Sequence, residues 1–233
     1  MEGEQIRILA ADDDPEILKI LVRLLESQGY QVTTAVNGQE AAELASEEID
    51  LYILDVNMPI VSGFAAAARI RERFLAPIIF LTAYSGDGDR QMGFLAGADD
   101  YVVKPFSNQE LLLRIKSLLR RVRQYGQEAG KKQEKSSRLC CQDLILDLDA
   151  QQAILGDRSV ALTHTEFRIL ELFLSHPGKI FSLENIYQSI WEEEAVGDGT
   201  IMAHIKNIRK KLGDSPRNPR YIKTAWGKGY YVD

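Results

Sequence analysis

The amino-acid sequence predicts an α/β protein in which a doubly wound, five-stranded parallel sheet is followed by a smaller α+β domain. Three observations indicate this fold class. Apolar runs alternate five times with helix-like segments through the first 121 residues, which is typical of a parallel sheet with right-handed crossovers. Residues 122–138 then lose all apolar periodicity, and the rest of the chain combines short strands, three helices and a terminal hairpin.

The predicted strands of the first domain are apolar runs bounded by turn residues. They are IRILAA at 6–11, QVTTAV at 31–36, DLYILD at 50–55, APIIFLT at 76–82 and DYVVKP at 100–105. Between them, apolar residues recur at helical spacing, and the predicted helices cover residues 16–29, 38–49, 63–74, 89–98 and 108–121. Asp14 directly precedes Pro15, so we expect it to cap the first helix.

The second domain is expected after a flexible linker. Residues 122–138 are rich in Lys, Gln, Gly and Ser, a composition typical of linkers, so the predicted domains are residues 1–121 and 139–233. Short strands follow at 144–149, 152–157 and 159–163. Thr163 and Glu166 have the capping-box spacing of a helix start. Further helices are predicted from near Ser182 and over 200–212, before two strands around the turn at 227–229, an order that fits a winged-helix module.

Length and composition predict a two-domain cytoplasmic protein without a membrane partner. The 233 residues suffice for two modest cores. The sequence has no apolar run of about 18 residues, and its acidic start is unlike a signal peptide. Cys140 and Cys141 are the only cysteines; because they are adjacent, they support neither a disulfide framework nor a zinc cluster.

Polar side chains stand where four of the predicted strands end. Asp12 and Asp13 follow the first strand, Asp55 ends the third, Thr82 ends the fourth and Lys104 follows the fifth. Ligands of open parallel sheets bind beyond these carboxyl ends, so we expect the five groups to meet. Three neighbouring carboxylates repel one another, and a hard cation with oxygen ligands, such as Mg²⁺, relieves the repulsion.

This constellation predicts phosphoryl transfer to a carboxylate. Asp55, beside the metal and Lys104, is the expected nucleophile. The metal and Lys104 would neutralise the phosphoryl oxygens during transfer. Asn57 would give its backbone carbonyl to the metal, and Thr82 would donate its hydroxyl to the attached phosphoryl group.

The same landmarks resemble the receiver domain of two-component response regulators over about residues 5–121. They are Asp12-Asp13, DVNMP followed by Gly63, LTA at 81–83 and YVVKPF at 101–106. The resemblance implies a flavodoxin-like fold, phosphorylation of Asp55 by a sensor histidine kinase, and Mg²⁺ held by Asp12, Asp13 and Asp55. It also implies coupled switching of Thr82 and Tyr101 and a cis bond before Pro105. The chain would then be no enzyme beyond its own phosphotransfer and dephosphorylation.

Two other classes of protein compete with this interpretation. A phosphatase or hydrolase with an aspartate nucleophile would need a second acid two positions later, where this chain has Asn57. A flavin-binding domain would need a Ser/Thr/Gly-rich phosphate loop after the first strand, where this chain has three aspartates. Neither alternative accounts for the basic end of the chain.

The C-terminal end of this acidic protein is basic and predicts DNA binding. The formal net charge is -6, but Lys and Arg outnumber Asp and Glu over residues 199–233. In the helix at 200–212, Ile201, Ile205, Ile208 and Leu212 form a core-facing stripe. The other positions present a basic face to solvent. The predicted DNA contacts are Thr200, His204, Lys206, Asn207, Arg209, Lys210, Lys211, Thr224, Trp226 and Lys228.

LTHTEFRILELFL, GTIMAHIKNIRKKL and YIKTAWGKGYYV resemble the winged-helix effector domain of the OmpR/PhoB subfamily, with a wing similar to that of VanR-type regulators. The resemblance implies a third helix in the major groove of double-stranded promoter DNA, a wing at the adjacent minor groove, and a loop at 191–199 available to RNA polymerase. Many members have Arg where this chain has Asn207 and Trp226. Because Asn pairs bidentately with adenine, we predict an A·T-containing half-site.

Coupling between the domains is expected to act through a receiver homodimer formed on phosphorylation, because two modules on adjacent half-sites give useful specificity. The family's dimer face lies on the fourth helix, fifth strand and fifth helix. The matching positions offer intersubunit pairs of Arg90 with Glu110, Asp99 with Lys116 and Asp100 with Arg114. Leu95 and Leu113 would supply apolar contact.

Overall fold

A computed structural model describes residues 5–83, 98–128, 138–191 and 199–233. The chain divides into two compact units, residues 1–120 and 121–233, and each is considered by itself. The predicted helix at 89–98 lies almost wholly outside the described residues.

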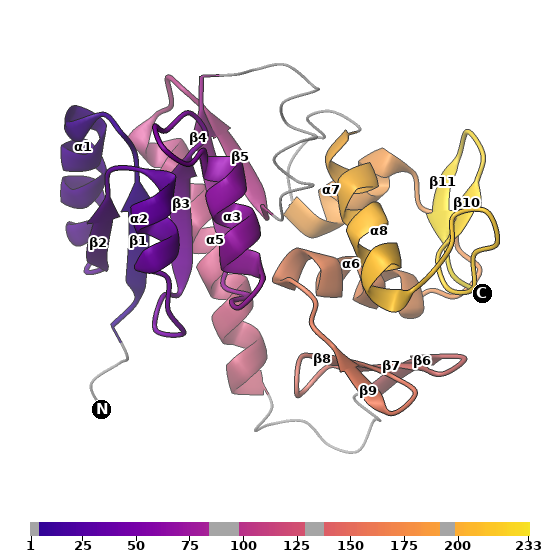
Figure 1. Cartoon of the computed structure of the whole chain (residues 1–233). Coiled ribbons are helices and arrows are strands. Elements are labelled where there is room, and N and C mark those ends of the chain that lie inside the picture. The colour runs from indigo at the N-terminus through magenta and orange to yellow at the C-terminus, as the bar shows by residue number, and fades with distance from the viewer. Residues whose placement is uncertain (1–4, 84–97, 129–137, 192–198) are drawn as a thin grey trace. The chain divides into compact units, whose positions relative to one another are not determined.

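The first unit is built on a five-stranded parallel sheet with strand order β2-β1-β3-β4-β5, which confirms the predicted fold (Figure 1). The strands are β1 (Arg7–Ala11), β2 (Gln31–Ala35), β3 (Leu51–Asp55), β4 (Ile78–Thr82) and β5 (Asp100–Val103). Every residue of β3 and β4 is buried, because a central strand of a parallel sheet is covered on both faces. Their apolar runs therefore end directly at polar residues on one edge.

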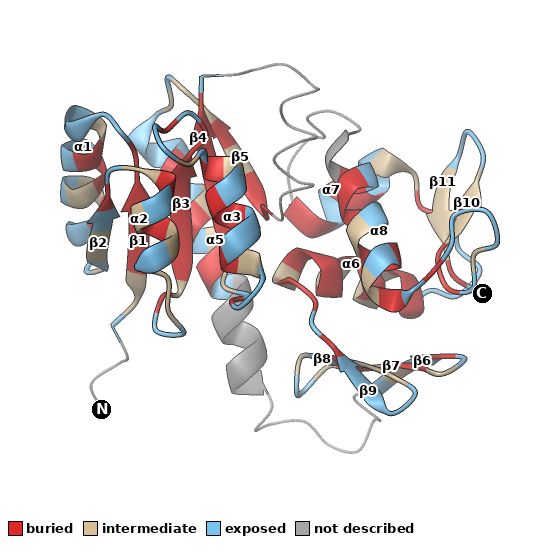
Figure 2. Ribbon diagram, in the orientation of Figure 1, coloured by how far each residue is buried: buried red, intermediate tan, exposed pale blue. Residues whose placement is uncertain are grey.

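Helices cover both faces of this sheet. They are α1 (Pro15–Glu26), α2 (Gly38–Glu43), α3 (Gly63–Arg71) and α5 (Asn108–Glu128). The apolar stripes of α1 and α5 share one core with Ile8, Ile53 and Leu81 of the strands. On α3, Phe64 packs edge-on against Phe80 of β4, with ring centroids 5.1 Å apart. Figure 2 shows the resulting buried stripes on the helices and the buried sheet between them.

The bounds of two helices differ from those predicted. The helix α2 ends at Glu43 rather than at residue 49, because the Ser46 carbonyl accepts hydrogen bonds from the Ile49 amide and the Tyr52 hydroxyl instead of continuing the helix. The helix α5 continues to Glu128, so residues 122–128 of the predicted linker are helical. They contain no proline, so no residue of this segment forbids helix, although Gly126 is a weak helix former. Asp14 caps α1 as predicted, accepting from the Glu16 amide at 2.8 Å.

The second unit has the strands, three helices and hairpin of a winged helix. An antiparallel sheet contains β6 (Arg138–Cys141), β7 (Leu144–Asp147), β8 (Gln152–Leu155) and β9 (Arg158–Val160). The helices are α6 (His164–Leu174), α7 (Leu183–Trp191) and α8 (Gly199–Leu212). Thr163 and Glu166 form the predicted capping box at the start of α6. The strands β10 (Lys223–Ala225) and β11 (Gly229–Tyr231) form the C-terminal hairpin, here called the wing.

The wing is fixed to the segment before α7. The amide of Phe181 donates to the Tyr230 carbonyl at 2.9 Å, and the Tyr230 amide donates to the Phe181 carbonyl at 3.0 Å. Gly229 makes this approach possible, because a Cβ atom there would lie 1.9 Å from the Phe181 carbonyl oxygen. The outer edge of β11 is therefore hydrogen-bonded to this segment.

Candidate functional site

The sheet topology brings one ammonium group and two carboxylates together at the carboxyl edge of the first unit. Lys104 Nζ lies 2.6 Å from Asp12 Oδ2 and 2.7 Å from Asp55 Oδ1. The pairing of Ala11 with Leu54 and of Asp55 with Leu81 aligns the ends of β1, β3 and β4. Lys104 lies 92 positions from Asp12 and 49 positions from Asp55 in the sequence, yet the three side chains form one ion-pair cluster, as predicted from the strand ends.

Burial shapes the electrostatics of this cluster. Asp12 and Asp55 are buried. Burial raises the pKa of Asp12 above its ordinary value, although the hydrogen bond from Lys104 opposes the rise. Burial alone would lower the pKa of Lys104, but its hydrogen bonds to the two carboxylates outweigh that effect and raise it. The Lys104 ammonium is therefore held charged between the two acids.

The remaining carboxylate oxygens are oriented by backbone amides. Asp12 Oδ1 accepts from the Asp14 amide at 3.0 Å, and Asp55 Oδ2 accepts from the Asn57 amide at 2.6 Å. Asp13 is exposed. Within the described part of the chain, no three or more acidic, His or Cys side chains are grouped as a metal site, so the expected cluster of three carboxylates is not present. The buried carboxylate oxygens of Asp12 and Asp55 nevertheless suit a hard cation chemically.

Thr82 and Tyr101 occupy neighbouring strands beside this cluster. Thr82 is buried, and its carbonyl accepts from the Lys104 amide at 2.6 Å. Tyr101 is half-buried and follows Asp100 in β5. The peptide bond before Pro105 is cis, as the family resemblance implied. Residues 84–97, which begin two positions after Thr82, lie outside the described residues.

The loop after Asp55 contains two unusual backbone positions, Gly63 and Ile60. Gly63 lies so close to β3 that a Cβ atom would be 2.0 Å from the Asp55 carbonyl oxygen. Ile60 adopts a φ of 68° although its side chain is β-branched, and it is 77% exposed. Sequence reasoning did not identify Ile60, because an isoleucine gives no signal of a left-handed backbone.

The expected dimer pair of Asp99 with Lys116 is contradicted by the structure. Asp99 is fully buried, and its Oδ2 atom accepts from Arg71 Nη2 at 2.6 Å and from the Ile78 amide at 3.1 Å. Lys116 instead donates to Gln28 at 2.8 Å. Asp99 thus links the start of β5 to α3 and β4, and its carboxylate is fully buried in the chain.

The other dimer-face residues pair within the chain. Arg114 lies 3.1 Å from Asp100 and 3.4 Å from Glu110, so both of its carboxylate partners are already in the same protomer. Leu113 is exposed on the same helix. Arg90 and Leu95, the other expected members of the dimer face, lie outside the described residues.

In α8 the predicted core stripe is confirmed, but fewer basic side chains face solvent than the sequence predicted. Ile201, Ile205, Ile208 and Leu212 are buried. Lys206 and Lys210 are exposed, Asn207 is half-buried, and the exposed Met202 lies one turn before Lys206. Met202 was missed because an apolar residue at an outward position resembles a core residue in sequence. The side chain of Thr200 lies outside the described residues.

Three predicted DNA contacts turn inward instead. His204 is buried beside the Trp191 ring, at a centroid distance of 5.8 Å. Lys211 Nζ lies 2.6 Å from Glu166 Oε2, and Arg209 is only 9% exposed. On a helix these positions flank the apolar stripe by one turn or less, so the buried face is broader than the four apolar residues indicated.

Arg209 joins α8 to the wing. Its Nη2 atom donates to the Ile222 carbonyl at 2.7 Å and to Thr224 Oγ1 at 3.0 Å. The guanidinium carbon also lies 5.6 Å from the centroid of the Tyr230 ring. Arg209 and Thr224 are thus partners in a structural contact, which corrects the prediction that the Arg209 side chain contacts DNA.

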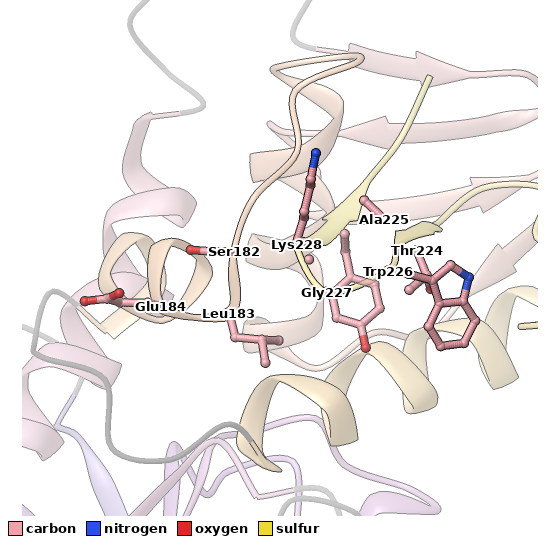
Figure 3. Close-up of a pocket in the computed structure, with 10 residues that line it drawn as sticks. Ser182, Leu183, Glu184, Thr224, Ala225, Trp226, Gly227 and Lys228 are labelled. Carbon is pink, nitrogen blue, oxygen red and sulfur yellow. The ribbon is translucent and has the colours of Figure 1, made fainter.

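The wing borders a hollow of about 460 Å³. Figure 3 shows its lining, which comes from the start of α7 and from the wing. Trp226 and Lys228 project from the wing in different directions (Figure 3). Trp226 is 89% exposed, and Lys228 is exposed as well.

Comparisons with known proteins match both units. Residues 8–116 match the response regulator receiver domain, and residues 157–232 match the C-terminal domain of transcriptional regulatory proteins. The transcriptional regulatory protein YrkP of Bacillus subtilis is 39% identical over 96% of this chain and 96% of its own length. The regulatory protein VanRc of Enterococcus gallinarum is 36% identical over 97% of this chain and 98% of its own length.

The fold of the whole chain also matches a solved structure. A mutant of RitR aligns with a TM-score of 0.74 at 23% identity, covering 98% of this chain and 99% of that one. In the described part of the chain, no helix is both long and apolar enough to cross a membrane.

Proposed function

The chain belongs to the two-component response regulators of the OmpR/PhoB type, and from this premise we propose that phosphorylation of Asp55 controls its binding to promoter DNA. It is a transcription regulator with a receiver domain and a winged-helix domain rather than an enzyme with a separate substrate. Membership favours this function over the hydrolase and flavin-binding alternatives. The observation that carries the proposal is the contact of Asp55 with Lys104 at 2.7 Å.

Asp55 accepts the phosphoryl group in this proposal. One of its carboxylate oxygens attacks the phosphorus of a phosphohistidine in a sensor kinase, the O–P bond forms, the P–N bond breaks, and the ring nitrogen leaves with the electron pair. Lys104 is already charged beside Asp55 and stabilises the added negative charge. The Asn57 amide holds the second Asp55 oxygen in place.

Receivers of this family generally bind Mg²⁺ at the acidic site, and the cation would neutralise the phosphoryl oxygens. Its expected ligands are Asp12, Asp13, Asp55 and the backbone carbonyl of Asn57. Asp12 is suited to this role because its burial and the nearby Asp55 charge raise its pKa, and a cation offsets both effects.

Thr82 and Tyr101 are the proposed switch residues. The Thr82 hydroxyl would donate to the phosphoryl group, and Tyr101 would move with it. The buried position of Thr82 at the end of β4, hydrogen-bonded through its carbonyl to Lys104, supports this role. Through these two residues, β4 and β5 would couple the phosphorylation of Asp55 to the dimer face.

Intact mass spectrometry after incubation with acetyl phosphate tests the receiver chemistry. Wild-type protein should gain one phosphoryl group when Mg²⁺ is present, and Asp55→Asn should gain none. Asp157→Asn, an exposed acid-to-amide change in the second unit, is the matched control and should gain the group normally. A wild-type protein that binds Mg²⁺ but stays unmodified, with acetyl phosphate and with a phosphorylated kinase domain, would contradict the proposal.

The DNA contacts of α8 divide by chemistry. Lys206 and Lys210 are exposed and suit phosphates, which gives affinity and salt dependence without sequence. Asn207 suits adenine, and Met202 suits the methyl group of thymine. We therefore propose an A·T-containing half-site. Selection from random duplexes tests it, and a motif with guanine at the position contacted by Asn207 would contradict it.

Phosphorylation is proposed to form a homodimer through α5 and β5. Leu113 supplies exposed apolar surface, and Arg114 would exchange its carboxylate partners Asp100 and Glu110 between subunits. Sedimentation velocity should show a dimer of the phosphorylated chain, and Leu113→Asp should abolish it. The proposed domains are residues 1–121 and 139–233, joined by a linker at 122–138 whose first part, to Glu128, is helical. We also propose that the protein is cytoplasmic and that a sensor histidine kinase is its phosphodonor. The loop at 191–199 would contact RNA polymerase.

A further inference from the structure

Trp226 leaves an unusually large apolar surface in water. It is 89% exposed, more than any other large apolar side chain among the described residues. Trp191, in α7, is 5% exposed. Aromatic side chains carry large burial energies and are favoured where they contact a partner. The indole is therefore available for a contact that the isolated chain does not make.

The backbone that carries this indole is held by hydrogen bonds on both sides of the turn. Beside it, Ala225 pairs with Gly229, and Thr224 pairs with Tyr230. Arg209 fixes Thr224 to α8, and Phe181 pairs with Tyr230 at the outer edge. The backbone reverses at Gly227, with a φ of 68°. A rigidly supported aromatic ring loses little conformational entropy when it is buried against a partner.

The charges near Trp226 indicate a polyanionic partner. Lys228 lies two residues away on the same turn, and α8 contributes the exposed Lys206 and Lys210 to the same domain. The neighbouring hollow has one acid, Glu184, in its lining, which disfavours a free anion there. A domain that exposes an apolar ring together with several ammonium groups matches duplex DNA, whose charged backbone borders stacked, apolar base surfaces.

We propose that Trp226 inserts from the minor groove between two base pairs of the bound duplex, unstacks them and bends the DNA. This inference rests on the proposed function and specifies how the wing contributes to it. Apolar side chains inserted in this way kink a duplex by about 20–90° toward the major groove. Pyrimidine–purine steps are the easiest to unstack, so Trp226 favours a TA or CA step beside the half-site contacted by α8.

Base unstacking can be measured directly at the site. Duplexes of about 30 base pairs are first selected from a random pool with the phosphorylated wild-type chain. The adenine of each TA or CA step in the selected sequence is then replaced in turn by 2-aminopurine, whose fluorescence rises on unstacking. The variants compared are wild type, Trp226→Ala, Trp226→Phe and Ile180→Ala, the last being an exposed apolar control outside the proposed contact.

The wild type should raise the fluorescence at one step and bend the duplex by about 20° or more in an end-to-end FRET assay. Trp226→Ala should abolish both signals and weaken binding about tenfold or more, Trp226→Phe should retain part of each, and Ile180→Ala should match the wild type. If wild type and Trp226→Ala bind the duplex equally with equal bends, the insertion is wrong while DNA binding stands. If the wild type selects no duplex, the proposed function itself fails.

Discussion

Arg209 of α8 and Ile222, which precedes the wing, are joined by a hydrogen bond of 2.7 Å from the guanidinium Nη2 atom to the Ile222 carbonyl oxygen. The same nitrogen also donates to Thr224. A helix expected to lie in the major groove and a hairpin expected at the minor groove are thereby connected by one side chain. The angle between these two elements depends on a buried residue that would contact no DNA.

Replacing Arg209 should therefore destabilise the second unit. Arg209→Ala leaves the Ile222 carbonyl and Thr224 hydroxyl without this donor, and we expect a loss of about 2–4 kcal/mol in unfolding free energy. Urea denaturation followed by circular dichroism measures it. Lys210→Ala, one position along and exposed, should change stability by less than about 0.5 kcal/mol. Equal stabilities for the two variants would contradict the structural role of Arg209.

The ion pair of Arg71 with Asp99 should contribute more to the unfolding free energy of the first unit than any exposed ion pair does. Arg71→Ala leaves the fully buried Asp99 carboxylate without its cation, which typically costs about 3–5 kcal/mol. Arg69→Ala removes an exposed arginine from the same helix and is the control. A loss of dimerisation in Asp99→Asn with unchanged monomer stability would instead restore Asp99 to the dimer face.

Even the smallest side chain added at Gly63 should destabilise the first unit. In Gly63→Ala the new methyl group would lie 2.0 Å from the Asp55 carbonyl oxygen, so the loop must shift away from the acceptor. We expect a loss of about 2 kcal/mol or more and slower modification by acetyl phosphate. Alanine ordinarily stabilises a helix relative to glycine. The control is therefore the reverse change, Ala68→Gly at an exposed position of α3, which should lower the unfolding free energy by about 1 kcal/mol. A more stable Gly63→Ala protein would refute the close contact.

Tyr52 should make the first unit sensitive to alkaline pH. Burial raises the pKa of its hydroxyl from 10.0 to about 12, so between these values the folded chain retains a proton that the unfolded chain loses. Stability must then fall as pH rises above 10, by about 2–3 kcal/mol at pH 12.

In Tyr52→Phe this part of the alkaline loss should be absent, whereas Tyr231→Phe should keep it. The measurement is the urea midpoint of each protein at pH 8, 10 and 11. Parallel curves for wild type and Tyr52→Phe would show that the hydroxyl ionises as readily in the folded chain as in the unfolded one.

Sequence reasoning succeeded where one pattern determines one structure. The buried runs of β3 and β4 and the polar residues at their ends predicted both the sheet and the contacts of Lys104 with Asp12 and Asp55. It failed where a charged residue has two possible environments. Arg209 and Asp99 are polar in sequence, yet each finds its partner across the fold, and no local spacing reveals that partner.

The placement of Asp13 shows a second limit. Its position next to Asp12 predicted a shared site, but adjacent residues at the end of a strand point in different directions. Asp13 is exposed and does not join the ion pairs of Lys104 with Asp12 and Asp55, so its role as a Mg²⁺ ligand stays a prediction. Ile60 shows a third limit, because its left-handed backbone depends on the path of the loop around Asp55 rather than on its own preference.

The firm attachment of the wing at Gly229 has an evolutionary consequence. Because Phe181 and Arg209 carry the contacts that position the hairpin, the side chain at position 226 contributes little to folding. Mutations there can change which promoters are bound without a cost in stability, whereas Gly229 is constrained because a Cβ atom at its position would lie 1.9 Å from the Phe181 carbonyl oxygen. Duplicated copies of such a regulator could diverge first at the tip of the wing.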